Sequence, residues 1–296
     1  MATGGFSASP QMHRDYFGLA EAYPLGTPGN TGDGLRILQK AGADLWHLRN
    51  FGQSGGIWPG FKVPEFDAVF MRNFFWQTFS WIEIDAENRR FYNETAELQL
   101  THYKEKRHGH WVDTPHHRAA PVHMIFDEAT RAANCLTIKV MSWNPVVHGY
   151  DWSDDNSAEV ARGWIVRADT LAELALAIGR DPQAVEREVA AYNASCLSGC
   201  DVEFGRDPAT LQPLAAPPYY AIRVAPAIVC TSGGARRNIE SEALDHDGRR
   251  IPRLHRAHRR GDDRARGGRR SGQHQLCRPP RRRQRPLPRQ LRHRRR

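Results

Sequence analysis

Four histidines that lie close together are the first residues here whose type and spacing suggest chemistry. The segment RHGHWVDTPHH contains them, as His108, His110, His116 and His117. A zinc site needs ligands that converge on one point and partners that orient them, and this spacing matches no standard ligand pattern. The segment therefore favours a surface loop, and the sequence predicts no metal site. No Ser–His–Asp or Cys–His constellation can be argued from the spacings either.

Two adjacent tyrosines, Tyr219 and Tyr220 in the segment PPYYAIRVAPAIV, are the other candidates for catalysis. A phenol is able to serve as an acid or as a hydrogen-bond donor to a substrate. A tyrosine at the edge of a strand also has an ordinary structural role. Both interpretations stay open, and no catalytic residue is assigned.

The cysteines and the apolar runs bear on where the chain works. Neither a disulfide framework nor a zinc knuckle follows from five irregularly spaced cysteines, an odd number. We expect reduced thiols and a cytoplasmic protein. The start, MATGGFSASP, lacks the features of a signal peptide, and no apolar run is long enough to predict a membrane span.

Charge is divided unevenly along the 296 residues. Residues 253–296 contain eighteen Arg and two Asp, whereas residues 1–252 carry a net charge of −7. An arginine-rich tail of this kind is able to bind phosphates, so a basic nucleic-acid-binding protein is the alternative function. The tail lacks interleaved aromatic residues for base stacking, and we expect its contacts with nucleic acid to be adventitious. It has no periodicity and predicts disorder.

The elements that must position a site are clearest in the middle of the chain. Thr170 and Glu173 form a capping box before one helix, and Asp181 with Pro182 begins a second, whose end is expected at Asn193. An earlier helix is expected from Gly34, with Leu35, Leu38, Leu45 and Leu48 on its apolar face and Asp33 as its cap. WIEIDAENRRFYNE predicts a β-hairpin. Strands are expected within PVHMIFDEATR and PPYYAIRVAPAIV, and on both sides of the Asp-Gly turn in EALDHDGRRIP.

Eight segments in this order resemble a known family. They are ATGGF, NTGDG, RRFYNE, TLAELALAIGRDPQAVEREVAAYN, FGR, PPYYAIRV, TSGGARRN and LDHDGRRIPRL. Together they are similar to the FAD-dependent fumarate reductase and succinate dehydrogenase flavoproteins, which include the 3-ketosteroid 1-dehydrogenases. The resemblance spans roughly residues 1–254. It implies an α/β fold, with a doubly wound FAD-binding domain and an inserted α+β capping domain.

The resemblance also implies domain boundaries and a reaction. Residues 1–52 would be part of the FAD-binding domain, 53–215 the capping domain, 216–252 the return into the FAD-binding domain, and 253–296 the tail. The cofactor would be FAD, whose N5 takes or gives a hydride at a carbon–carbon bond next to a carbonyl. The residues that the resemblance places at the cofactor are Ala2, Thr3, Gly4, Gly5, Asp33, Thr231, Ser232, Gly233 and Gly234.

Two departures from the family pattern limit these expectations. The diphosphate-binding pattern G-x-G-x-x-G occurs nowhere in the chain, and GNTGDG is rejected as a substitute because it lies in a loop well after ATGG. After IPRL, the family would continue with a flavin-side segment, AGE, but the arginine-rich tail follows instead. Shifted by one nucleotide, codons for residues 259–264 admit AGEMTG. We therefore expect a chain truncated at its N-terminus and frameshifted near residues 253–258, which is inactive and binds FAD weakly or not at all.

The substrate expected from the resemblance is neutral rather than a dicarboxylate. Fumarate-reducing members carry a His where this chain has Cys230, and an Arg soon after Asn93 and Glu94, where none occurs before Arg107. We expect a carbonyl-conjugated or steroid-like compound. The aromatic segment FFWQTFSW is either a substrate wall or ordinary core packing.

Overall fold

A computed structural model describes residues 3–48, 57–73, 75–95, 104–107, 110–113, 120–139 and 149–255, all within one compact unit of residues 1–257. Side chains are described for all of these except 57, 58, 104–107 and 110–113. His108, His116 and His117 lie outside the described residues, as do Ala2 and almost all of the arginine-rich tail.

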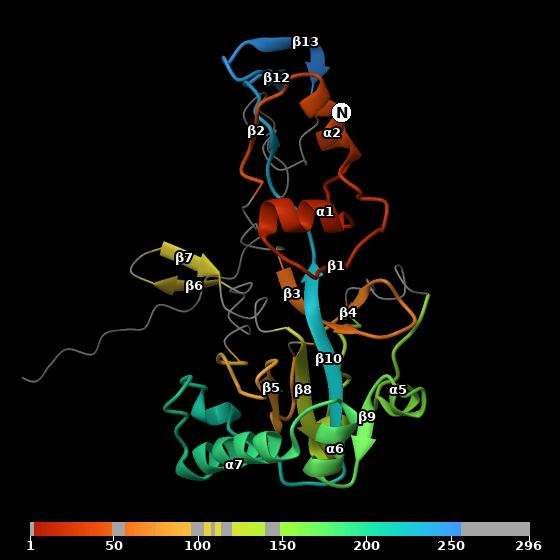
Figure 1. Ribbon diagram of the computed structural model, residues 1–296, viewed down its shortest axis with the longest axis vertical. Helices are drawn as coiled ribbons and strands as arrows, with labels where there is room; N and C mark the ends of the chain where they lie inside the picture. The colour runs from red at the N-terminus through yellow and green to blue at the C-terminus, as the bar shows by residue number, and fades with distance from the viewer. Residues whose placement is uncertain are drawn as a thin grey trace, which may run out of the picture. The chain divides into compact units, whose positions relative to one another are not determined.

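A sheet of seven strands forms the centre of the unit, and β10 (Tyr219–Ile228) is its hub (Figure 1). The sheet order is β4 (Val69–Met71), β3 (Ile57–Lys62), β10, β8 (Val122–Asp127) and β5 (Trp81–Ile84). β9 (Val166–Ala168) pairs antiparallel with β10, and β1 (Tyr23–Pro24) makes the one parallel pair of this sheet. Both faces are covered, because residues at odd and at even positions of β10 are buried alike.

Two helices with predicted N-terminal caps pack on one face of the sheet and form a core with it. α6 (Leu171–Ala177) begins at the predicted capping box of Thr170 and Glu173, and α7 (Pro182–Ser198) begins at Asp181. Their apolar residues pack on β5, β8 and β10, with Leu174, Val185, Val189 and Tyr192 fully or almost fully buried. The expected end at Asn193 is wrong, because the helix continues to Gly199. The Asn193 carboxamide instead bonds both backbone groups of Leu214.

The aromatic residues form a second core on the opposite face. Trp81, Phe70, Phe126 and Trp152 are almost completely buried there, and Trp76 packs against Trp81 with ring centroids 5.1 Å apart. FFWQTFSW therefore supplies core packing at Trp76 and Trp81, while Phe75 is 62% exposed. The shorter helical elements are α3 (Glu128–Ala133), α5 (Ser157–Ala161) and the 3₁₀ turn η4 (Pro208–Thr210).

The predicted hairpin at residues 81–94 is wrong in its second half. The turn forms, with the Asp85 N–H donating to the Arg89 carbonyl, but β5 pairs with β8 instead of with RRFYNE. The alternation of apolar and acidic residues in WIEI suggested a strand with one face in solvent. The Glu83 carboxylate is instead completely buried and pairs with buried Arg72. A strand covered on both faces does not keep a solvent face for its polar residues.

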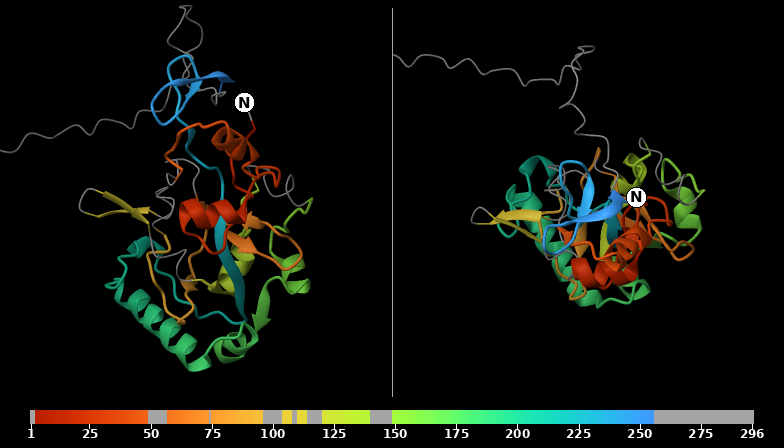
Figure 2. Two further views of the ribbon diagram at one scale, coloured as in Figure 1. Left: turned by 45° about the horizontal axis from the view of Figure 1, so that its top comes forward. Right: turned by 90° about the horizontal axis from the view of Figure 1, so that it is seen from above.

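Short helices and strands from the N-terminal and C-terminal parts of the unit pack against each other. α1 (Pro10–Met12) leads into a π-helical turn, η1 (His13–Phe17), and α2 (Asp33–Lys40) follows a loop. β2 (Leu45–Trp46) pairs with β11 (Gly234–Ala235). The hairpin of β12 (Glu242–Leu244) and β13 (Arg250–His255) packs beside α2 through Leu38, Ala43 and Ala243 (Figure 2). A separate hairpin consists of β6 (Lys104–Arg107) and β7 (His110–Asp113).

In this region the structure confirms the predicted strands around the Asp-Gly turn but shortens the predicted helix from Gly34. The strands on both sides of the Asp-Gly turn are confirmed as β12 and β13, and β13 runs to His255, three residues into the segment expected to be tail. The helix expected from Gly34 ends at Lys40, and Gly42, at φ +83°, turns the chain so that Leu45 lies in β2. Among the described residues, no helix combines the length and apolarity that crossing a bilayer requires.

Candidate functional site

The candidate cofactor residues near the N-terminus contact Thr231, more than 200 positions later in the sequence. The Phe6 N–H donates to the Thr231 hydroxyl at 3.1 Å. A Cβ on Gly5 would lie 2.0 Å from the Thr231 Oγ1, so only glycine allows this approach. Gly4 has a φ of +72°, and its Cβ would lie 2.2 Å from the Asn30 Oδ1. The fold therefore places Gly5 against Thr231 and Gly4 against Asn30.

The N-terminus of α2 joins the same place. The Gly32 N–H donates to the Gly5 carbonyl at 3.1 Å, and a Cβ on Gly34 would overlap the Thr3 side chain. Thr3 and Gly4 are exposed at the surface. Asn30 also belongs to this cluster, although it was not predicted to. Its place in the glycine-rich segment GNTGDG was the one sequence feature that could have indicated it.

Asp33 does not cap α2, contrary to the expectation. The N-cap is Gly32, at a φ of 84°, and no side chain bonds the free backbone N–H groups there. The Asp33 carboxylate instead accepts from the Thr31 hydroxyl and from Arg36, each at 2.9 Å. Asp33 cannot reach back as a cap because it is already the first helical residue. Its side chain is 72% exposed beside the N-terminal residues.

Residues 231–234 continue this surface along β2. Gly234 pairs with Trp46, and a Cβ on Gly233 would lie 2.5 Å from the Trp46 carbonyl oxygen. Gly233 has a φ of +83°, which side chains rarely allow. Thr231, Ser232 and Gly233 are all partly exposed. We call residues 3–5, 30–34 and 231–234 the glycine surface.

The chemistry of the glycine surface suits a large polar ligand that approaches the backbone. Partly exposed glycines and hydroxyl groups leave main-chain atoms accessible. The carboxylate of Asp33 would accept hydrogen bonds from hydroxyl groups and repel phosphate. The surface therefore suits an uncharged, hydroxyl-bearing part of a ligand better than a phosphate group.

Tyr219 and Tyr220 lie at the other end of β10. Ten residues of strand span roughly 30 Å, so the structure does not bring these tyrosines to the glycine surface. Tyr220 is 4% exposed, stacks on Phe126 and donates to the Glu128 carboxylate. Burial, followed by the neighbouring Glu128, raises the pKa of Tyr220 to about 12. Burial and then Asp127 raise the pKa of Tyr219. These surroundings favour the structural interpretation of both residues.

No group of three or more His, Cys, Asp or Glu side chains within the described ranges is arranged to hold a metal ion. A buried histidine that the sequence analysis passed over, His13, lies just behind the glycine surface. It is 1% exposed, and its Nε2 is 3.1 Å from the Phe6 carbonyl oxygen. Burial lowers the pKa of His13 more than its backbone hydrogen bonds raise it. The imidazole is therefore a neutral support for the segment that carries Gly5.

Comparisons with known proteins agree with this geometry. A family described as FAD binding domain matches residues 1–257. Digoxin reductase of Eggerthella lenta is 30% identical over 76% of this chain and 38% of its own length. NADH:fumarate oxidoreductase of Klebsiella pneumoniae is 26% identical over 83% of this chain and 23% of its own length.

A solved structure shows the same fold. The 3-ketosteroid delta1-dehydrogenase of Sterolibacterium denitrificans, in complex with 1,4-androstadiene-3,17-dione, superposes with a TM-score of 0.61 at 25% identity. The match covers 85% of this chain and 45% of that one. The chain thus spans less than half the length of each of these three proteins.

Proposed function

Because this chain belongs to the FAD binding domain family, with the fumarate reductases and ketosteroid dehydrogenases, we propose that it forms part of an FAD-dependent oxidoreductase acting on a carbon–carbon bond next to a carbonyl. The bound flavin would supply the hydride chemistry. The chain's own residues would bind and orient the cofactor.

The glycine surface is the observation that carries this proposal. Three segments, distant in sequence, meet there. Gly4, Gly5 and Gly233 are at least partly exposed, whereas Gly32, Gly34 and Gly234 are buried where the segments pack together. The residues of this surface fit FAD because glycines allow a large polar ligand to approach the main-chain atoms closely. Thr3, Gly4, Gly5, Thr231, Ser232, Gly233 and Gly234 would lie along the cofactor. Asp33 would accept hydrogen bonds from its hydroxyl groups.

The proposed domain assignment follows from the pairing of distant segments. Residues 1–52 and 216–252 would both belong to the FAD-binding domain. Support comes from β1 pairing with β10 and from β2 pairing with β11. Residues 53–215 would form the capping domain, whose strands β3 and β8 pair with β10 in the central sheet.

We propose a neutral, carbonyl-conjugated substrate of steroid-like size. The support is the similar ketosteroid dehydrogenase, which was solved in complex with a steroid, together with the absence of the two dicarboxylate-handling residues from the sequence. Glu94 fits no substrate role, since it is buried and bonds Arg90. The substrate would meet the flavin side of the glycine surface, near Cys230.

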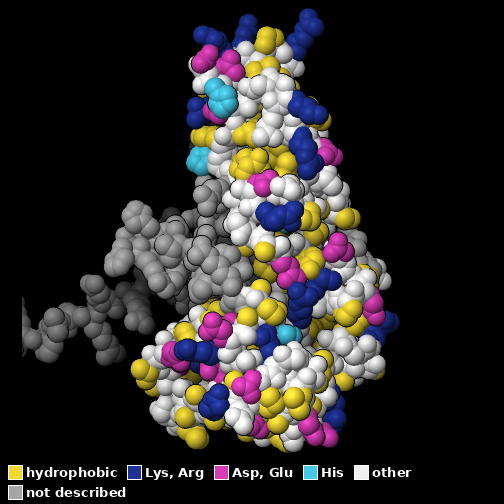
Figure 3. Space-filling view, in the orientation of Figure 1, with side chains coloured by type: hydrophobic (Ala, Val, Ile, Leu, Met, Phe, Trp, Pro, Cys, Tyr) yellow, Lys and Arg dark blue, Asp and Glu magenta, His cyan; other side chains and the backbone are white. Residues whose placement is uncertain are grey.

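The nucleic-acid alternative has no support from the described residues. On the face shown in Figure 3, basic and acidic side chains are interspersed, so its described part presents no continuous basic patch. The arginine-rich segment that suggested this function lies outside the described residues.

FAD titration of the purified chain, followed by a turnover assay, tests the proposal. Because G-x-G-x-x-G is absent, we propose weak binding and little or no turnover by the chain alone. FAD should bind saturably, without the stoichiometric flavin absorbance of a tight complex. With FAD added, any turnover should be seen with a steroid enone and not with fumarate. A chain that does not bind FAD at any concentration would contradict the assignment of the glycine surface.

A further inference from the structure

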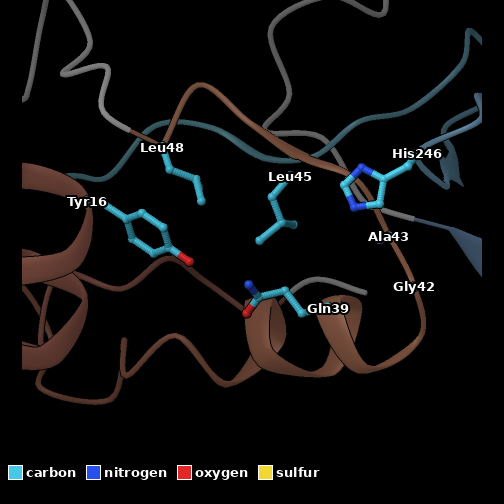
Figure 4. Close-up of a pocket in the computed structure, with 7 residues that line it drawn as sticks. All are labelled: Tyr16, Gln39, Gly42, Ala43, Leu45, Leu48 and His246. Carbon is cyan, nitrogen blue, oxygen red and sulfur yellow. The ribbon is translucent and has the colours of Figure 1, made fainter.

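A cavity separate from the glycine surface opens between η1, α2 and the loop that follows α2. Its volume is about 410 Å³, which is within the usual range for small-molecule sites. Its wall is formed by Tyr16, Gln39, Ala43, Leu45, Leu48 and His246 (Figure 4). None of these residues is among those of the glycine surface, although Leu45 belongs to β2, which pairs with Gly234 and Ala235.

Polar groups face this cavity without partners of their own. Figure 4 shows the Tyr16 hydroxyl and the Gln39 carboxamide directed toward each other across one end of the cavity. Within the described ranges, neither group has a hydrogen-bond partner. A phenol and a carboxamide together offer both donors and acceptors. They therefore provide a polar anchor for one end of a ligand.

His246 provides the anchor at the other end. Its imidazole is 83% exposed, yet its Nδ1 lies 3.2 Å from the Asp44 carboxylate, which orients the ring. The second oxygen of Asp44 is 3.2 Å from the Arg236 Nε. Asp44 is thus engaged by two partners, and the remaining imidazole nitrogen is left to contact a ligand.

The wall between the two anchors is aliphatic. Leu45 and Leu48 line one side, and Ala43 lies next to His246. Among the described residues that line the cavity, none is a lysine, arginine, aspartate or glutamate. A carboxylate or phosphate ligand would lose its hydration here and gain no opposite charge.

We propose that this cavity binds an uncharged ring compound that carries an oxygen substituent at each end. One oxygen would bond Tyr16 and Gln39, the other would bond His246, and the ring would pack on Leu45 and Leu48. The site is distinct from the flavin-binding surface, and the ligand would be a second small molecule.

Calorimetric titration of the full chain, without FAD, tests the proposal. The probe is a dihydroxynaphthalene with its hydroxyl groups at opposite ends of the ring system. We expect saturable binding that Tyr16→Phe weakens about fivefold, as the loss of one hydrogen bond predicts. Gln39→Leu should have a similar effect. Leu45→Trp should fill the cavity and abolish binding.

Two comparisons make the result decisive. Leu197→Ala, at an 87% exposed position of α7, should leave binding unchanged. Naphthalene dicarboxylate, of the same shape but charged, should bind at least tenfold more weakly. The proposal would be overturned if the probe failed to bind the folded chain, if the dicarboxylate bound equally well, or if Leu45→Trp, shown to be folded by its thermal transition, still bound the probe.

Discussion

Single contacts at the glycine surface decide whether two distant segments can meet. Gly5 and Thr231 are in such close contact that one added methyl group must displace the hydroxyl. The same close contact occurs between Gly4 and the Asn30 side chain, and between Gly34 and the Thr3 side chain. Glycine is therefore required at these positions so that one segment can approach another. Because glycine has no side chain, its backbone atoms also stay accessible where it lies at the surface.

Gly5→Ala is expected to weaken FAD binding about tenfold and to lower the free energy of unfolding by about 1–3 kcal/mol, because Thr231 must move. FAD titration and urea unfolding measure the two effects. Thr231→Ala in the same chain should recover much of the stability lost through the clash. Gly26→Ala is the control, since Gly26 has no positive φ and no atom lies within 4 Å of its added Cβ. An additive double variant would show that the clash is not the cause.

His123 makes stability depend on pH. Burial and then the charges of Arg180 and Arg223 lower the pKa of His123 to about 4, and its Nδ1 lies 3.1 Å from the Arg180 Nη2. An unfolded histidine, with a pKa near 6.5, binds more protons in this range. Stability from the neutral ring is therefore complete above about pH 6.5 and falls as the pH decreases toward about 4.

His123→Gln should remove that part of the acid sensitivity, on the order of 2 kcal/mol between neutral pH and pH ~4. Urea unfolding at several pH values measures the slope. His255→Gln, at an exposed position of β13, is the matched control. An unchanged slope in the His123 variant would show that another group titrates.

At the scale of elements, the sequence predicted those whose signals are local. The capping box of α6, the Asp–Pro start of α7 and the Asp-Gly turn between β12 and β13 involve residues only a few positions apart. β3 was not predicted, because IWPGFK contains Pro59 and Gly60 and becomes a strand only beside β10. Gly60 is needed there, since its Cβ would lie 2.6 Å from Val69.

The candidate site shows the same division between local and distant information. Family resemblance alone singled out Gly4, Gly5 and residues 231–234 as cofactor residues, and the structure shows Gly5 in contact with Thr231. The contacts of Asn30 and His13 depend on how the loop of residues 18–32 returns, which no local pattern reveals. Asp33 was correctly placed near the start of α2 but was wrongly expected to cap it.

Thr170→Ala tests whether the capping box stabilises the helices that cover the sheet. It should lower the free energy of unfolding by about 1 kcal/mol, since the Glu173 N–H loses its acceptor. Thr170→Ser retains the hydroxyl and should change little. Equal losses in both variants would assign the effect to the methyl group instead.

A buried ionic network joins the segment after β5 to the end of α7. Arg90 donates to Glu94 at 2.6 Å and to Asp201 at 2.9 Å, and all three side chains are at most 3% exposed. Burial alone would raise the pKa of Asp201, but its hydrogen bond and charge interaction with Arg90 outweigh burial and lower it. The stability from Asp201 is thus present above the ordinary aspartate pKa and lost as the pH falls below it.

Asp201→Asn should lower the free energy of unfolding by about 3 kcal/mol at neutral pH, because Arg90 loses a buried partner. Urea unfolding measures the loss. Asp169→Asn, whose side chain is 74% exposed, should change stability by less than about 1 kcal/mol. Equal effects of the two substitutions would contradict a special role for the network.

At the scale of the whole molecule, β10 connects the two proposed domains. One half of the strand pairs with β8 and β9 against the core beneath α6 and α7, and the other half pairs with β3 and β1 and leads to Thr231. Strands of both proposed domains therefore belong to one sheet, whereas β11 of the glycine surface pairs with β2 in a separate sheet. Within 296 residues, the chain contains the glycine surface but no G-x-G-x-x-G pattern, and this combination is the reason to expect weak binding.

Photolabelling with an azido analogue of FAD, followed by peptide mapping, tests the central assignment most directly, since it detects weak binding and reports its location. The labels should fall on peptides that contain residues 3–5, 30–34 and 231–234, and excess FAD should suppress them. Labels confined to residues 253–296 and removed by added salt would instead show that arginines bind the diphosphate by charge alone, and that the glycine surface does not face the flavin.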